Sequence, residues 1–180
     1  MPETFFAYHA VTERPMPPRI CLDEGHPNGV RARVEAQRGI VEDIWANPEK
    51  YREEELPYPV KVALRELALE KVRREKYPGY PSRMGCLYVS RTWQEARHWA
   101  EYFDSLGRQV LGVVKLRITG AFFAGDAAKC FDGTVDEAEN LRLARRYWEN
   151  KTTPQDERPI VELLAAGTME IVEEDSLWKR

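Results

Sequence analysis

The sequence has few cysteines and few histidines, and it has no long apolar run. Its 180 residues include three cysteines and three histidines, and the cysteines form no Cys-x-x-Cys pair. We therefore expect no structural zinc site and no other bound metal. An odd number of cysteines is typical of free thiols in a reducing compartment, which predicts a cytoplasmic protein. No apolar stretch approaches the roughly 20 residues that cross a bilayer, and the first residues lack the pattern of a signal peptide.

Common nucleotide-binding and hydrolase motifs are also absent. The sequence contains no GxxxxGK[ST], no GxGxxG after a predicted strand, no HExxH and no GxSxG. The kinase, dehydrogenase and serine hydrolase classes therefore lose their usual support. With 27 basic and 30 acidic residues the net charge is −3, without the basic excess of a general nucleic-acid-binding domain. The basic stretch at residues 71–76 interleaves with Glu70 and Glu75, which predicts a solvated helix face.

What the sequence does contain is the composition of a folded domain. Hydrophobic residues make up 43% and aromatic residues 11%, which is globular rather than disordered. A chain of this length can bury roughly 70% of its unfolded surface without disulfides or metals. We expect a single domain over residues 1–180.

The first half of the chain predicts mainly helices. A short strand at residues 5–9 precedes a loop at residues 13–29, where proline and glycine break regular structure. Apolar periodicity then predicts a helix over residues 31–47 and a second helix over residues 60–76 that is buried on more than one face. Together these helices form a helical insertion at about residues 31–76.

The second half predicts mainly strands. The Thr92–Glu95 and Thr134–Glu137 sequences have the form of capping boxes and each predicts the start of a helix. The predicted strands are residues 84–90, 110–118, 121–124, 160–164 and 168–173, the last two around a turn at Ala166-Gly167. Helices first and strands later indicate an α+β domain.

The cysteines give little support to a thiol nucleophile. Cys86 lies within an apolar predicted strand, and Cys130 lies in a loop with no histidine close in sequence. A reactive thiol needs a neighbouring base or another group that lowers its pKa. We therefore expect both cysteines to pack as small apolar side chains.

Three separated segments carry the clearest functional pattern. Residues 6–12 read Phe-Ala-Tyr-His-Ala-Val-Thr, residues 85–96 contain Leu-Tyr-Val-Ser, and residues 159–171 contain Ile-Val-Glu-Leu-Leu. In order, they place a histidine on an early strand, a tyrosine on a strand that enters a helix, and a glutamate on a later strand. This order resembles that of the ADP-ribosyltransferases, in the branch of diphtheria toxin and the poly-ADP-ribose polymerases.

That resemblance implies a split β-sheet core, with the helical insertion between the first and second motif strands. It implies NAD as the substrate, cleavage of its nicotinamide–ribose bond, and transfer of ADP-ribose to a macromolecular acceptor, either protein or nucleic acid. Matched residue by residue, His9 would bind the nicotinamide-side ribose, Tyr88 would stack on the nicotinamide ring, and Glu162 would be catalytic. The three side chains are then expected to face one cavity, with the helical insertion beside it.

The sequence departs from this family in two places. His9 is followed by Ala10-Val11-Thr12, where the family often has a glycine and a small hydroxyl residue. The helical insertion leaves the adenosine side of an NAD site unassigned. Arg83 and Ser90 are candidate cofactor-binding residues from their positions alone.

Nearly the whole chain also resembles an uncharacterised bacterial and phage family of unknown function. The segments that carry this second resemblance are Tyr-Pro-Gly-Tyr-Pro-Ser-Arg at residues 77–83, Cys-Leu-Tyr-Val-Ser at residues 86–90, and the helix that contains Tyr147-Trp148.

Two alternatives to a transferase stay open. The same fold can serve as a non-catalytic module that binds a nucleotide or a protein, because a fold does not fix a function. A phosphotransferase that acts on RNA ends is less favoured, since it would need arginine and histidine contacts that the sequence does not place. His9 and Tyr88 can also be ordinary sheet residues. An ionised Glu162 in an apolar strand is costly unless it has a function or a partner.

Overall fold

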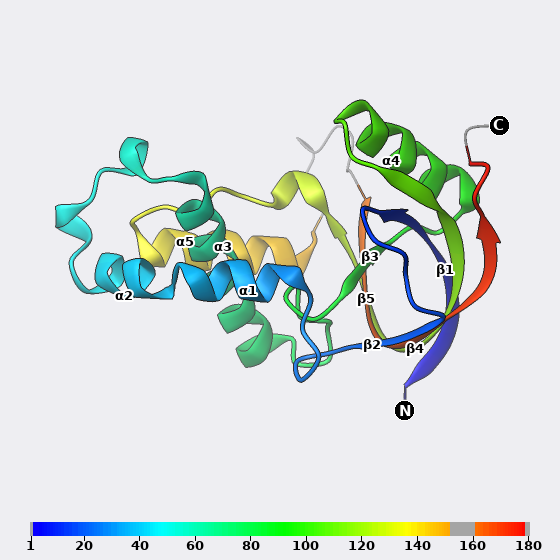
Figure 1. Ribbon diagram of the computed structural model, residues 1–180. Helices are drawn as coiled ribbons and strands as arrows, with labels where there is room; N and C mark the ends of the chain where they lie inside the picture. Colours follow the sequence, from blue (N-terminus) through cyan, green and yellow to red (C-terminus); the bar gives the residue numbers. More distant parts are fainter. Residues whose placement is uncertain (1, 152–160, 179–180) are drawn as a thin grey trace.

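The computed structural model describes residues 2–151 and 161–178, and it confirms the α+β class. Within these residues, an antiparallel sheet of five strands lies beside five α-helices (Figure 1). The strands are β1 (Glu3–Thr12), β2 (Arg19–Leu22), β3 (Leu87–Val89), β4 (Val110–Asp126) and β5 (Val161–Asp175). The helices are α1 (Gly29–Ala36), α2 (Arg38–Ala46), α3 (Tyr58–Lys76), α4 (Trp93–Ser105) and α5 (Glu137–Glu149), and the 3₁₀ turns are Pro48–Lys50, Glu53–Glu55 and Ala127–Lys129.

The sheet curls so that β1 meets the residue that follows β3. Its strand order is β1-β4-β5-β2, and β3 pairs with an earlier stretch of β5 than β2 does. Tyr8 of β1 and Ser90, just after β3, exchange two backbone hydrogen bonds of 2.9 and 2.7 Å. Apolar side chains from β1, β3, β4 and β5 form one buried cluster, which includes Ala7, Val89, Leu116, Leu163 and Met169. The result is a barrel-like sheet with a filled interior.

Each of the two longest strands is continuous where the sequence predicted two strands. Gly120 of β4 lies opposite Gly167 of β5, and a Cβ at Gly120 would lie 2.0 Å from the backbone oxygen of Ala166. Gly167 has a φ of +122°, which side-chain-bearing residues rarely adopt. The glycines therefore allow a bend with close backbone approach, and the predicted turn at residues 166–167 is wrong.

The short strands also differ from expectation. The proline-rich loop contains β2, which pairs with residues 167–170 of β5. The strand predicted over residues 84–90 is limited to Leu87–Val89. Its earlier residues form a turn in which the Gly85 amide donates to the Ser82 carbonyl oxygen. The start of the strand predicted at residue 160 and the prolines before it lie outside the described residues.

The helical insertion packs on one side of the sheet with α5 (Figure 1). The predicted helix over residues 31–47 is broken at Gln37, which ends α1 and precedes α2. This break lets Val34 of α1 and Ile44 of α2 enter the same buried cluster against α3. The helix predicted over residues 60–76 is confirmed as α3, and it is buried on several faces.

The remaining helices begin at polar caps. The Thr92 hydroxyl accepts a hydrogen bond from the Glu95 amide, as the capping box predicted, and α4 packs against β1 and β4. The predicted cap at Thr134 is wrong by two residues. Asp136 is the N-cap of α5, since its carboxylate accepts from the Glu139 amide.

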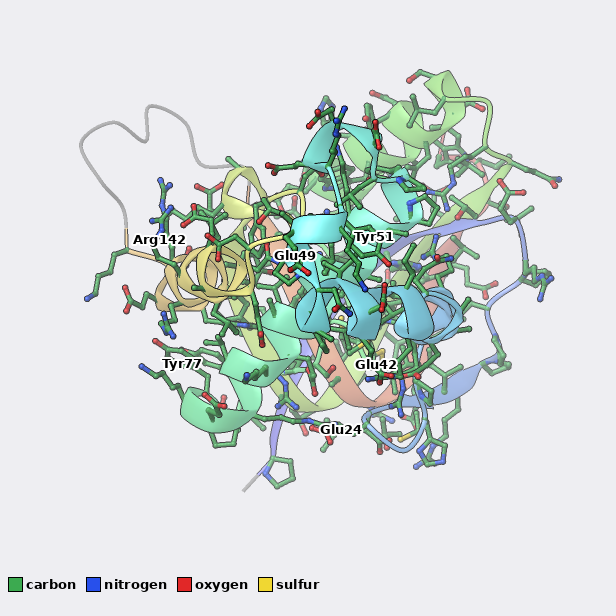
Figure 2. The ribbon with its side chains drawn as sticks, turned by 90° about the vertical axis from the view of Figure 1, so that its left-hand side faces the viewer. Glu24, Glu42, Glu49, Tyr51, Tyr77 and Arg142 are labelled. Carbon is green, nitrogen blue, oxygen red and sulfur yellow. The ribbon has the colours of Figure 1, made fainter. Side chains whose placement is uncertain are left out.

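The basic stretch at the end of α3 is only partly solvated. Arg73 is buried and forms ion pairs with Glu70 and with Glu24 from the loop after β2. Glu24 lies on the helical side of the molecule (Figure 2). The pairing ties the end of α3 to that loop, so the expectation of a wholly exposed basic face is corrected. In the described part of the chain, no helix is both long and apolar enough to span a membrane.

Candidate functional site

All five predicted site residues line one cavity of about 340 Å³. The cavity lies where β1, the end of β3 and the start of β5 approach α4 and the 3₁₀ turn Ala127–Lys129. The residues are His9, Arg83, Tyr88, Ser90 and Glu162. Small-molecule sites commonly measure roughly 300–1,000 Å³. The expected convergence of three distant segments on one cavity is therefore present in the fold.

His9 enters the cavity from β1 with one ring nitrogen fixed. Its Nδ1 lies 2.8 Å from the backbone oxygen of Tyr88. A carbonyl oxygen can only accept, so Nδ1 carries the proton and Nε2 is left as an acceptor in the neutral ring. Burial lowers the pKa of His9, which favours this neutral form, although the bond to Tyr88 acts in the opposite direction.

Tyr88 lies on β3, and Ser90 follows that strand at the bridge that closes the sheet. Tyr88 pairs with Leu164 of β5, and its side chain remains partly exposed at the cavity. Ser90 is buried, and its backbone is held by Tyr8 of β1. The bridge that closes the sheet thus also fixes this side of the cavity.

Glu162 lies near the start of β5, where it pairs with Gly125 of β4. Its side chain is only 11% exposed, so an ionised carboxylate needs a partner. That partner is Arg83, whose Nη1 donates to Glu162 Oε1 at 2.5 Å. Among the described residues, Oε2 accepts no hydrogen bond.

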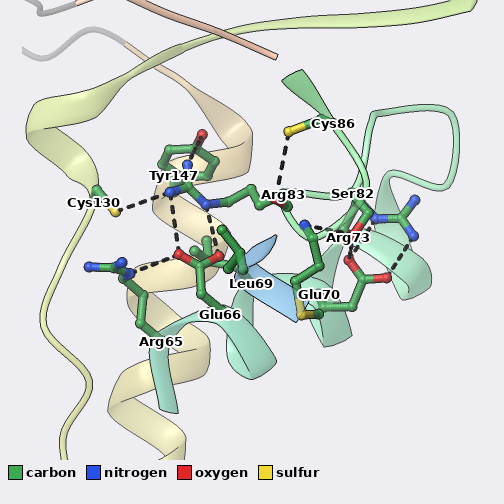
Figure 3. Close-up of polar contacts among 12 residues, drawn as sticks. Arg65, Glu66, Leu69, Glu70, Arg73, Ser82, Arg83, Cys86, Cys130 and Tyr147 are labelled. Carbon is green, nitrogen blue, oxygen red and sulfur yellow. Dashed lines mark hydrogen bonds and ion pairs between the residues drawn. The ribbon is translucent and has the colours of Figure 1, made fainter. Parts of the chain in front are cut away.

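Arg83 is the centre of a buried network of polar contacts (Figure 3). Its Nε donates to Glu66 of α3 at 2.9 Å, and its Nη1 also donates to the hydroxyl of Tyr147 of α5 at 2.8 Å. Its Nη2 contacts Glu66 and the sulfur of Cys130. Burial lowers the pKa of Arg83, but the nearby Glu66 and other acidic groups raise it well above its usual value. All three guanidinium nitrogens therefore contact protein groups, in addition to any contact with a ligand.

Local hydrogen bonds explain why Arg83 enters this network. The preceding residue, Ser82, donates through its hydroxyl to Glu70 of α3 at 2.8 Å. Asn28, the N-cap of α1, donates through its amide to the backbone oxygens of Arg83 and Cys86 at 2.8 and 2.9 Å. Helices α1 and α3 thereby hold the turn that presents Arg83 to the start of β5.

The sequence reading missed four residues of the site. Trp99 and Phe103 of α4 line the cavity, although the sequence predicted only that a helix begins after Thr92. Glu66 and Tyr147 hold Arg83 from outside the cavity lining. A glutamate within the apolar pattern of residues 60–72 was the available signal for Glu66, because a buried carboxylate implies a cation close by.

The two inner cysteines fit the expected packing roles. Cys86 is buried, and Cys130 is half-buried at the cavity wall. Burial raises the pKa of both thiols, although the neighbouring Arg83 acts in the opposite direction. Both side chains are therefore protonated thiols near neutral pH, which disfavours a thiolate nucleophile.

One surface turn among the described residues brings metal-ligand side chains together. Single atoms of Cys21, Asp23 and His26 lie within 4.8 Å of one another, and all three residues are exposed. The Asp23 carboxylate already accepts from the backbone amide of His26 at 2.7 Å. These contacts account for the geometry as a hydrogen-bonded turn, and the turn does not belong to the cavity.

One protein-family model matches a stretch of the chain that contains most of the site residues. The family model described as "Protein of unknown function (DUF2441)" matches residues 31–176. The match includes Arg83, Tyr88 and Glu162, and it begins after the strand that carries His9. No curated protein matches the chain.

Proposed function

The chain belongs to the DUF2441 family, whose function is unknown, and we propose that it is an NAD-dependent ADP-ribosyltransferase. The enzyme would cleave the nicotinamide–ribose bond and transfer ADP-ribose to a macromolecular acceptor, either protein or nucleic acid. The observation that carries the proposal is the convergence of His9, Tyr88 and Glu162 on one cavity of about 340 Å³. The three residues come from segments that are far apart in the sequence.

The sheet supports the proposal of an ADP-ribosyltransferase-like core. The strand with Tyr88 is hydrogen-bonded to the strand with Glu162, and it meets the strand with His9 through Ser90. The helical insertion lies between the first and second of these strands in sequence. The closed sheet therefore keeps the three motif residues around one opening.

The chemistry assigned to Glu162 is electrostatic. When the bond between C1′ and the nicotinamide nitrogen breaks, nicotinamide leaves with the electron pair and the ribose gains oxocarbenium character. A carboxylate beside that sugar lowers the barrier. Since Oε1 of Glu162 binds Arg83, Oε2 is the oxygen available to accept from the ribose 2′-hydroxyl. An acceptor oxygen or nitrogen then bonds to C1′ and loses its proton to solvent.

The other two motif residues orient the substrate. The unprotonated Nε2 of His9 can accept a hydrogen bond from a ribose hydroxyl, because its Nδ1 proton is used by the Tyr88 carbonyl. The exposed part of the Tyr88 ring offers a flat apolar face for the nicotinamide ring. Trp99 lines the same cavity and adds a second aromatic surface.

Replacement of Glu162 by glutamine tests the proposal. Glu162→Gln keeps the side-chain shape but removes the charge, so nicotinamide release from NAD should fall by about 10²-fold or more. Binding of NAD, measured by calorimetry, should stay within a few fold because ground-state contacts are retained. Glu170→Gln is the matched control, since Glu170 lies on the same strand and pairs with Arg117 away from the cavity. Full nicotinamide release by Glu162→Gln would remove Glu162 from the mechanism.

A non-catalytic nucleotide- or protein-binding module is the second candidate. The direct ion pair between Arg83 and Glu162 favours it, because a carboxylate held by a buried cation can serve stability alone. Wild-type protein that binds NAD or ADP-ribose but releases no nicotinamide would support this candidate and contradict the transferase.

A further inference from the structure

We propose that a second cavity, between the helical insertion and the sheet, binds the adenosine diphosphate half of NAD. This cavity measures about 620 Å³, and residues of α1 and α3 line it. The inference rests on the proposed function, because it extends the ligand whose nicotinamide half occupies the cavity of His9 and Glu162. It assigns a role to the helical insertion, which lies beside the sheet (Figure 1).

The two cavities have a common wall. Arg83 and Tyr88 line both of them. NAD consists of two nucleosides joined by a diphosphate, so a molecule with its nicotinamide at Tyr88 must continue into a neighbouring space. The cavity at α1 and α3 begins at that same tyrosine.

Charge favours this cavity for the diphosphate. Its lining includes the basic residues Arg33, Arg65 and Arg83 and the acidic residue Glu66. Arg65 and Arg83 are balanced by Glu66 and by Glu162, with which Arg83 also pairs, so the excess positive charge that faces a diphosphate is that of Arg33. The other adjoining cavity, along α4, is lined by Glu95 and His98 and by neither lysine nor arginine. A diphosphate there would meet a carboxylate and a histidine, and no permanently charged cation.

Arg33 is the side chain free to bind the phosphates. Arg65 and Arg83 are both held by Glu66. Arg33 is exposed on α1 and forms no ion pair or hydrogen bond with the residues that the structure describes. Guanidinium groups bind phosphate oxygens through paired N–H donors, so Arg33 can contact the ligand without breaking an internal contact.

An aromatic ring is available for the base. Tyr58, at the start of α3, lines the cavity and is 66% exposed. Base–aromatic stacking needs such an accessible ring face. Tyr58 and Arg33 thus supply the two contacts, stacking and charge, that an adenosine diphosphate requires.

Calorimetric titration with ADP-ribose tests the inference without depending on catalysis. Arg33→Ala should raise the Kd for ADP-ribose by about tenfold at low salt, the usual scale of a lost charge-assisted contact. Tyr58→Ala should weaken ADP-ribose binding as well. Arg31→Ala is the matched control on the same helix, because Arg31 pairs with Glu35 and lines a different cavity. The Kd of Arg31→Ala for ADP-ribose should equal that of the wild type.

The outcomes separate this inference from the proposed function. Nicotinamide release together with an unchanged ADP-ribose affinity in Arg33→Ala would overturn the inference alone. ADP-ribose binding that depends on Arg33, without nicotinamide release, would support the inference and overturn the transferase. Wild-type protein that does not bind ADP-ribose would overturn the inference. Thermal melting of each variant excludes unfolding as the cause.

Discussion

Arg83 is the single side chain on which most of the site depends. Among the residues that the structure describes, Arg83 is the cation that pairs with Glu162, and it shares Glu66 with Arg65. Removal of one member of a buried ion pair leaves an uncompensated charge, which costs more than the pair contributes. The network therefore holds the Glu162 carboxylate in place at the cavity.

The first prediction concerns the stability of this network. Arg83→Met should lower the free energy of unfolding by about 3–5 kcal/mol, because it removes the cation that pairs with the buried Glu162 carboxylate. Urea unfolding at pH 7 measures the change. Arg142→Met is the control, since Arg142 pairs with Glu139 on the exposed surface of α5 and its loss should have little effect. An unchanged urea midpoint for Arg83→Met would contradict a structural role.

Glu162→Gln should behave differently from Arg83→Met. The glutamine oxygen can still accept from Arg83, and Arg83 retains both contacts with Glu66. We expect a loss of only about 1–2 kcal/mol, the scale of a weakened hydrogen bond to a charged group. Urea unfolding of the two variants in parallel checks this order. A loss for Glu162→Gln as large as that for Arg83→Met would make Glu162 primarily structural.

His9 predicts a dependence of stability on pH. Burial lowers its pKa in the folded protein, whereas the unfolded chain has a histidine pKa of about 6.5. As the pH falls below about 6.5, the unfolded state binds more protons than the folded state. The free energy of unfolding therefore decreases, by at most about 1.4 kcal/mol per pH unit.

The difference in the free energy of unfolding between pH 7.5 and pH 5.5 measures this effect. His9→Asn should lose less stability than the wild type over that range, since asparagine does not titrate and its amide can donate to the Tyr88 carbonyl oxygen. His98→Asn is the control, because His98 is exposed on α4. Equal pH profiles for His9→Asn and the wild type would show that His9 does not contribute.

At the scale of elements, the two glycines that face each other across β4 and β5 set the curvature of the sheet. Gly120→Ala would place a Cβ 2.0 Å from the Ala166 oxygen, so the strands must separate at the bend. We expect the free energy of unfolding to fall by more than about 3 kcal/mol, the range of severe core strain. Gly39→Ala in α2 is the control, since nothing lies within 4 Å of the added Cβ. A melting temperature for Gly120→Ala equal to that of the wild type would show that β4 and β5 do not need a glycine at this position.

The same glycines mark the limit of what the sequence could predict about the fold. Local patterns predicted α3, α4 and the main stretches of β1, β4 and β5 because periodicity and capping act over a few residues. Gly120 and Gly167 also read locally as breaks. Whether a glycine ends a strand or bends it depends on the opposite strand, which lies far away in sequence. The break at Gln37 likewise follows from packing against α3.

The candidate site likewise contains some residues that the sequence could predict and others that it could not. His9, Tyr88 and Glu162 were identifiable from their order and strand contexts, and the fold brings them to one cavity. Glu66 was not identified, because the apolar pattern around it indicates a buried carboxylate but does not show which cation it pairs with. Its contact with Arg83 becomes visible only when α3 is placed against the turn after it.

At the scale of the whole molecule, ligand binding should stabilise the fold as one unit. The site is built from β1, β3, β5 and α4, and its network extends to α3 and α5. ADP-ribose at a hundredfold excess over its Kd should add about 2.7 kcal/mol, which corresponds to a rise of about 5–10 °C in Tm. Differential scanning fluorimetry measures the shift, with free ribose at equal concentration as the control. A Tm that does not respond to ADP-ribose would contradict binding at this site.

The pairing of β1 with β4 also has a consequence during synthesis. Thr4 and Thr119, which are hydrogen-bonded neighbours in the two strands, lie 115 residues apart. At ordinary rates of translation the strand of His9 waits on the order of ten seconds for its partner, and β5 with Glu162 is made later still. A nascent or truncated chain that lacks β5 therefore has no assembled cavity, because His9 and Glu162 can meet only after β5 has been made and has left the ribosome.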